Sequence, residues 1–255
     1  MPDGADGESL ILPDACSDLV WEQGAGCYVA GPDTGPVRTV TKAGTVTVGV
    51  RFRPSAGGQV LGVPLSEIRD QRVPLADLLP AAAKRLPASL DPAEAAARAL
   101  DAAGLLIADA APDPAMTRVA TLLRDPSART EDVAGEVGLS ERQLRRRCHA
   151  AAGYGPKTLQ RVLRFQRFVR MLDATPPPAG APPATPAGPA GPRDLASAAA
   201  LASPAGPLAG PRDLASAAAL AGYADQAHLT RECAALSGLT PAALARVRGR
   251  AAPST

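Results

Sequence analysis

Residues Thr130–Ala151 read TEDVAGEVGLSERQLRRRCHAA and predict two short helices joined by a tight turn. Thr130 is a favourable N-cap, and the two acids that follow it suit the positive end of a helix. Gly138 fits the left-handed residue that ends a helix, and Ser140 fits the cap of the next one. The outer face of that second helix carries Arg142, Arg145 and Arg146. This pattern is typical of a helix-turn-helix, whose second helix enters the DNA major groove.

The alternative interpretation of this stretch is a helical hairpin with a solvated basic face. The surrounding charge favours a polyanion as partner. Residues 113–173 contain twelve basic and seven acidic residues and so carry a net charge of +5, whereas the whole chain carries only +2. A local positive field of this kind attracts nucleic acid.

A second stretch near the C-terminus predicts the same arrangement. Asp213–Ala221 predicts one helix, Gly222 the turn, and Asp225 the cap of a second helix. We expect the outward-facing residues of that helix to be Gln226, Ala227, Thr230 and Arg231. The two units could then occupy successive major-groove segments about 34 Å apart on one side of DNA.

The helix predicted over Lys157–Leu172 joins the two units. Its arginines recur at every third residue and therefore drift around the helix, so that some could reach phosphates while others are solvated. We assign phosphate contacts to Ser140, Lys157 and Arg161. Residues 174–210 are rich in Pro, Ala and Gly, and we expect a linker there because such a composition buries little apolar surface. AGPRDLASAAALA occurs in it at 190–202 and again at 209–221.

The N-terminal part predicts β-structure. Residues 1–9 are polar and expected to be disordered, and short β-branched runs separated by Gly, Pro and Asp follow over 10–63. The expected strands are Leu10–Leu12, Asp18–Trp21, Cys27–Ala30, Val37–Val40 and Thr45–Phe52. They would form a small open sheet or barrel with room for a ligand, and Trp21 is expected in its core.

Arg51 and Arg53 lie two residues apart, on one face of the last of these strands. Two interpretations are open. The arginines could bind an anionic effector inside the barrel, or they could form ordinary salt bridges with Asp14 or Asp18. After this region, a helix is predicted from Asp91 with Pro at its first position. Its apolar face, which includes Leu100 and Leu105–Ile107, suits packing on the sheet or on a second subunit.

The chain shows little sign of catalytic or metal chemistry. Its four cysteines form no CxxC pair and have no histidine at ligand spacing, so we expect neither a metal site nor a disulfide framework. There is no Ser/His/Asp set and no phosphate loop, so we expect no enzyme and no cofactor. No apolar run approaches the roughly 18 residues of a membrane span, and no signal peptide opens the chain. We therefore expect a cytoplasmic protein that does not contact a membrane.

Residues 113–247 resemble the C-terminal domain of AraC/XylS-type transcriptional regulators, in which a long helix bridges two helix-turn-helix units. The resemblance rests on VAGEVGLSERQLRRRC, GPKTLQRVLRFQR, DLASAAALAGYADQAHLTREC and SGLTPAAL. PDACSDLVW, VGVRFRP and LGVPLSEIRDQRVPLADL are similar to the sensor-like domain that accompanies it in many actinobacterial members. The chain departs from the family in three respects. Cys148 and Cys233 replace the usual aromatics, the linker is long and duplicated, and the N-terminal module begins without the first strands of its relatives.

The resemblance implies that Arg142, Arg145, Arg146, Gln226, Thr230 and Arg231 face bases. Arg suits guanine O6/N7 and Gln suits adenine N6/N7. The expected fold is α+β, with a small β-rich, barrel-like and incomplete domain followed by an all-α domain with two helix-turn-helix units. The expected divisions are 1–9, 10–80 for sensing or dimerisation, 81–112 as connecting helix, 113–173, 174–210, 211–247 and a tail at 248–255.

The expected function is a sequence-specific regulator that binds double-stranded DNA. RNA polymerase, a small-molecule effector and a second copy of the chain are further candidate partners. Two alternatives stay open. One is a ligand-binding or enzymatic N-terminal domain with DNA binding secondary to it, and the other is a non-specific nucleic-acid-binding protein.

Overall fold

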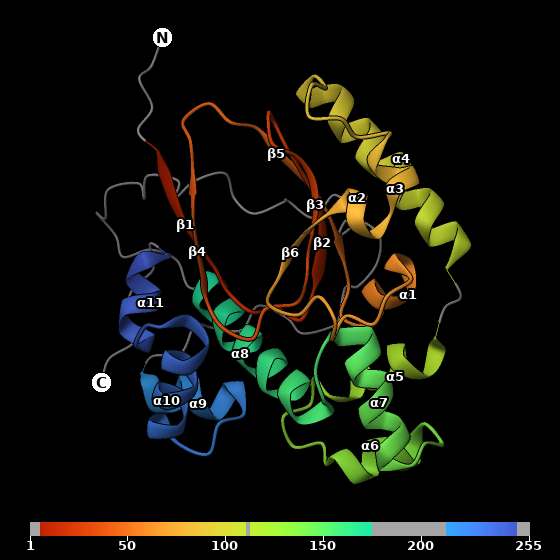
Figure 1. Ribbon diagram of the computed structural model, residues 1–255. Helices are drawn as coiled ribbons and strands as arrows, with labels where there is room; N and C mark the ends of the chain where they lie inside the picture. The colour runs from red at the N-terminus through yellow and green to blue at the C-terminus, as the bar shows by residue number, and fades with distance from the viewer. Residues whose placement is uncertain (1–5, 111–112, 175–212, 249–255) are drawn as a thin grey trace.

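A computed structural model describes residues 6–110, 113–174 and 213–248 of the chain. Its fold is α+β, with a β-rich region at the N-terminus and helices after it (Figure 1). The α+β class predicted from the sequence is therefore confirmed.

The strands of the described residues form two open antiparallel sheets. In the smaller sheet, β1 (Gly7–Ile11) pairs with β4 (Val37–Thr41). The larger sheet has the order β5-β2-β3-β6, with β5 (Thr47–Phe52), β2 (Ser17–Glu22), β3 (Gly26–Ala30) and β6 (Arg72–Pro74). The five predicted strands are thus present to within two or three residues at each end, and β6 is additional. The prediction of disorder over 1–9 is wrong in part, because β1 begins at Gly7.

Buried side chains of the larger sheet form a hydrophobic core, whereas the sequence suggested room for a ligand. Leu19 and Trp21 of β2 are fully buried, together with Val29 of β3 and Phe52 of β5. Trp21 also donates its indole N–H to the carbonyl of Pro87 at 3.0 Å. The expectation of a core tryptophan is confirmed, whereas the barrel-like closure is not found, since the sheets are open.

Short helices and one long helix complete the β-rich region. The short helices are α1 (Gly57–Leu61), α2 (Leu75–Leu78) and α3 (Pro80–Ala83), and the long one is α4 (Pro92–Asp109). Helix α4 packs on β5 and β2, as expected, but with a different face. Its buried residues are Ala95, Ala99, Ala102 and Ala103, while Leu100, Leu105 and Ile107 are about half exposed. Small alanines permit a closer approach to the sheet than leucines would.

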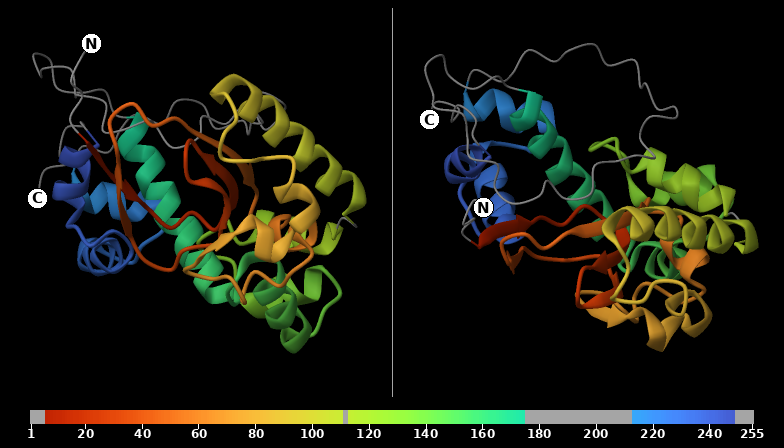
Figure 2. Two further views of the ribbon diagram at one scale, coloured as in Figure 1. Left: turned by 45° about the horizontal axis from the view of Figure 1, so that its top comes forward. Right: turned by 90° about the horizontal axis from the view of Figure 1, so that it is seen from above.

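The remaining helices form the second part of the chain. They are α5 (Pro114–Leu122), α6 (Thr130–Glu136), α7 (Glu141–Ala152), α8 (Pro156–Ala174), α9 (Leu214–Ala221), α10 (Gln226–Ser237) and α11 (Pro241–Val247). Helix α8 runs between the pair α6–α7 and the helices α9–α11 (Figures 1 and 2). One hydrophobic core includes residues of all these helices, with Phe165 and Phe168 of α8 fully buried in it.

The expected linker lies almost entirely outside the described residues. Ala174, its first residue, belongs to α8. The first repeat copy, at 190–202, lies outside the described residues, whereas most of the second copy forms α9. The expected tail at 248–255 begins with Arg248, which forms two hydrogen bonds to the Asp173 carboxylate at 2.7 and 2.6 Å. This pair ties the end of α11 to the end of α8.

The described residues contain neither a helix suited to span a membrane nor a cluster suited to bind a metal ion. None of the helices seen there is both long and apolar enough to cross a bilayer. Within the same ranges, no three His, Cys, Asp or Glu side chains gather closely enough to hold a metal ion.

Candidate nucleic-acid interface

Helices α6 and α7 meet at a tight turn built by Gly138. Its φ of 67° lies in the left-handed region, where a glycine is unstrained. The amide of Leu139 donates to the carbonyl of Ala134 at 2.9 Å and closes the end of α6. Thr130 is the first residue of α6 rather than its cap. The cap position is Arg129, which makes no side-chain capping bond, so that part of the prediction is wrong.

Ser140 caps α7 as predicted. Its hydroxyl accepts from the Gln143 amide at 3.3 Å, and the Gln143 side chain accepts from the Ser140 amide at 2.9 Å. This reciprocal capping box fixes the direction in which α7 leaves the turn. Leu144 and Cys148 of α7 are fully buried on its inner side. Burial also raises the pKa of the Cys148 thiol to about 12, so this cysteine is an inert core residue.

The outer side of α7 presents its arginines to solvent. Arg142, Arg145 and Arg146 are all exposed. Arg147 is turned away from them and lies 3.5 Å from the Asp113 carboxylate. The three residues assigned to base contacts are therefore brought together on one exposed side of one helix.

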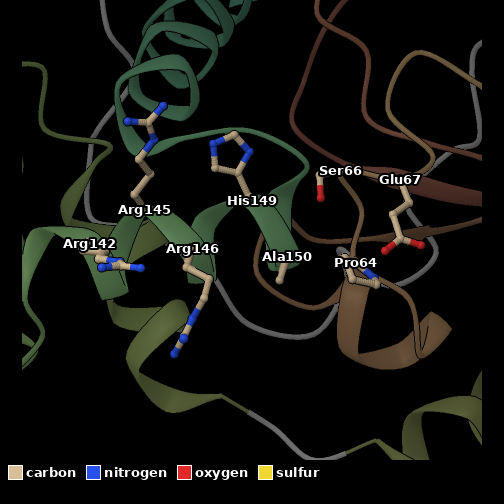
Figure 3. Close-up of a pocket in the computed structure, with 8 residues that line it drawn as sticks. All are labelled: Pro64, Ser66, Glu67, Arg142, Arg145, Arg146, His149 and Ala150. Atoms are coloured by element: carbon tan, nitrogen blue, oxygen red, sulfur yellow. The ribbon is translucent and has the colours of Figure 1, made fainter.

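A groove of about 550 Å³ runs along this side of α7, between the helix and the segment 64–67 (Figure 3). We call it the arginine groove. One wall consists of Arg142, Arg145, Arg146 and His149, and the other includes Pro64, Ser66 and Glu67. The ends of the Arg145 and Arg146 side chains point in different directions from this exposed side, and Glu67 lies next to Ser66 on the other wall (Figure 3). The second wall belongs to the β-rich region, and the sequence did not predict it.

Backbone hydrogen bonds hold this second wall in place. The amides of Leu65 and Ser66 donate to the carbonyls of Ala150 and His149 at 2.9 and 3.2 Å. Arg69 donates to the Gly153 carbonyl at 3.3 Å. These acceptors lie at the carboxyl end of α7, where the last carbonyls of a helix are available to outside donors, although His149 also accepts from the Gly153 amide. We call this set of contacts the seam.

The packing along the seam is close. Gly58 of α1 lies against α7, and a Cβ built on it would stand 2.2 Å from the Ala150 carbonyl oxygen. At Gly153, which has a φ of 82°, a Cβ would lie 2.4 Å from Pro32. The Gln166 amide of α8 also donates to the Pro13 carbonyl at 2.6 Å. At Gly58 and Gly153, the interface between the β-rich region and the helical region therefore has no space for an added methyl group.

His149 lies within this interface and in the groove. Burial lowers its pKa below the usual 6.5, and the positive charges of Arg145 and Arg69 lower it further. The imidazole is thus biased toward its neutral form at neutral pH.

The second predicted unit has the same local construction. Gly222 has a φ of 90° and ends α9, and Asp225 caps α10 by accepting from the His228 amide at 2.6 Å. Arg231 is exposed, while Gln226 and Thr230 are partly exposed. The Thr230 hydroxyl donates to the Gln226 carbonyl at 2.9 Å. Leu229 and Cys233 are fully buried on the other side, as expected.

The residues assigned to phosphates have different surroundings. The Ser140 hydroxyl belongs to the capping box, and Arg161 forms an ion pair with Glu232 of α10. Lys157 is exposed and borders a second, smaller hollow of about 360 Å³ beside Thr130 and Gln160. Among the described residues, neither a hydrogen bond nor an ion pair engages the Lys157 ammonium, in contrast to the side chains of Ser140 and Arg161. The guanidinium of Arg164 lies 5.6 Å from the ring centre of Tyr223.

Arg51 and Arg53 are not brought together at one site. Arg51 lies 2.8 Å from Asp14 and binds both carboxylate oxygens of Asp18 at 2.8 and 3.0 Å. Burial alone would lower the pKa of Arg51, but these acids outweigh it and raise the pKa. Arg53 follows the end of β5 and is exposed. The salt-bridge interpretation is therefore confirmed for Arg51.

The comparisons with known proteins concern the β-rich region alone. Residues 3–74 match a family described as a domain of unknown function (DUF6597). The match ends at the last residue of β6 and thus spans both sheets and α1. No curated protein and no solved structure matched the chain.

Proposed function

We propose that this protein is a DNA-binding transcriptional regulator of the cytoplasm that reads duplex DNA through α7 and α10. The observation that carries the proposal is the exposed row of Arg142, Arg145 and Arg146 on a capped helix that follows a glycine turn. Such a helix places long donor side chains where a major groove can receive them. The resemblance to AraC/XylS-type regulators supports the same interpretation.

The second helix pair favours sequence-specific DNA recognition over non-specific attraction to DNA. The pairs α6–α7 and α9–α10 share a left-handed glycine between the helices, a side-chain cap and a buried Leu and Cys on the second helix. A protein that binds two adjacent major-groove segments needs two such helix pairs, and α8 joins the two pairs in this chain. Polar side chains such as Gln226 and Thr230 form base-edge hydrogen bonds, which charge attraction alone does not need.

The test is selection of duplexes from a randomised pool, followed by sequencing of the bound fraction. We expect a defined site with two half-sites about one helical turn apart. Arg146→Ala should weaken binding to that site by about 1–3 kcal/mol and relax the preference at one position. Arg98→Ala is the matched control, because Arg98 pairs with Glu94 on α4.

Two outcomes would contradict parts of this proposal. Absence of any enriched sequence would make the protein a non-specific binder or no DNA binder at all. An equal loss for Arg146→Ala on selected and random duplexes would make Arg146 a phosphate contact, since phosphate contacts carry no sequence information.

A further inference from the structure

We infer that the DNA-binding groove is composite, with the segment 64–67 as its second wall and Glu67 as a carboxylate that opposes the DNA backbone. This inference rests on the proposed function and assigns a role to the β-rich region within the same site. It starts from the location of the arginine groove, whose two walls come from regions that are far apart in the sequence.

Segment 64–67 cannot move away from α7 without breaking hydrogen bonds. Leu65 is buried, and its amide and that of Ser66 are bonded to α7 carbonyls. Arg69 adds a third bond to the turn after α7. Helix α1, which precedes the segment, also packs closely on α7 at Gly58. The second wall is thus a fixed part of the groove.

The two walls of the arginine groove carry opposite charges. Pro64 and Glu67 are exposed on this wall, and Glu67 is its only charged residue among those that line the groove. Three arginines on the opposite wall attract a phosphate backbone. A duplex that follows those arginines brings its phosphates toward the Glu67 carboxylate, and like charges repel.

Repulsion between Glu67 and the phosphates should lower the affinity for DNA. It acts only when DNA is bound, so it does not affect the fold. The β-rich region therefore limits the strength of DNA binding through the Glu67 carboxylate, whose backbone neighbours Leu65 and Ser66 are bonded to α7. A change that opens the seam would remove this limit, which gives the N-terminal region a physical route to the DNA site.

The experiment compares Glu67→Gln with Glu94→Gln in the full chain, using the selected duplex at several salt concentrations. Both substitutions remove one exposed carboxylate, but Glu94 lies on α4 beside Arg98, away from the arginine groove. We expect Glu67→Gln to tighten binding about 1.5- to 5-fold, the range of exposed charge interactions. Glu94→Gln should leave it nearly unchanged, because salt screens charges beyond about 8 Å.

A second variant, Glu67→Lys, sharpens the result. If the new ammonium meets a phosphate, the slope of log affinity against log salt should steepen by about 0.9. Equal effects of the substitutions at Glu67 and Glu94, with an unchanged slope for Glu67→Lys, would overturn the composite groove while leaving DNA binding intact. Failure of the unmodified chain to bind any duplex would instead overturn the proposed function itself.

Discussion

The helix pairs α6–α7 and α9–α10 have similar local construction but different surroundings. Helix α7 presents three exposed arginines and is held at its carboxyl end by the β-rich region. Helix α10 presents one exposed arginine, and its Glu232 pairs with Arg161 of α8. Under the proposed function, the first pair would supply most of the attraction to phosphates, and the second would supply mainly polar contacts to bases.

The largest effects on stability are expected from substitutions in the core that the two helix pairs share. Leu144→Ala in α7 and Leu229→Ala in α10 each remove a fully buried side chain from one continuous cluster. We expect each to lower the free energy of unfolding by about 2–5 kcal/mol. Urea denaturation followed by circular dichroism should show a single transition in both cases.

Leu220→Ala is the control for these variants, because Leu220 is 42% exposed on α9. It should cost far less than either core substitution. Separate transitions for the two pairs, or a Leu220→Ala effect as large as that of Leu229→Ala, would show that the pairs do not form one cooperative core.

The second prediction concerns the seam, which only the first pair has. Gly58→Ala would place a methyl group 2.2 Å from the Ala150 carbonyl oxygen, so the backbone must shift. Such overpacking should reduce stability by about 1–3 kcal/mol, measured by thermal or urea unfolding. Hydrogen exchange should also be faster at the Leu65 and Ser66 amides, whose bonds cross the seam.

Gly104→Ala provides the matched substitution, since no atom lies within 4 Å of its added Cβ and the residue is inside α4. It should stabilise the chain by up to about 1 kcal/mol, because glycine is unfavourable in a helix interior. If Gly58→Ala were as well tolerated as Gly104→Ala, the seam would not be tightly packed.

The smallest expected effect is the pH dependence due to His149. Its pKa is lowered in the folded chain, first by burial and then by Arg145 and Arg69. The folded state therefore binds the proton less tightly than the unfolded state, and stability should fall as pH drops below about 6.5. His149→Gln should lose less stability than the unmodified chain between about pH 7.5 and 5. Parallel curves for the two proteins would show that His149 does not contribute.

The sequence predicted features that depend on local chemistry. Gly138 and Gly222 occupy left-handed turns, and Ser140 and Asp225 cap the following helices, because each role needs a particular residue type. The strand β2 and its tryptophan also followed from a short β-branched run. These features require no knowledge of distant parts of the chain.

Other features depend on contacts that no local pattern specifies. Strand β6 has three residues and ends in Pro74, so it lacks the alternation by which strands are recognised. Helix α4 has two apolar faces, and periodicity could not tell that the alanine face would pack on the sheet. The second wall of the arginine groove, including Glu67, arises only from the tertiary placement of segment 64–67. No signal in that segment indicated its position beside α7.

Trp21 is an intrinsic fluorescent probe of the β-rich region. It is the sole tryptophan of the sequence, and it is buried in the larger sheet with its indole bonded to Pro87. Tryptophan emission therefore reports the β-rich region, while the far-ultraviolet dichroism reports mainly the helices. Both signals can be recorded on one unlabelled sample during denaturation, with and without DNA. The comparison would reveal whether DNA binding at α7 changes the stability of the larger sheet.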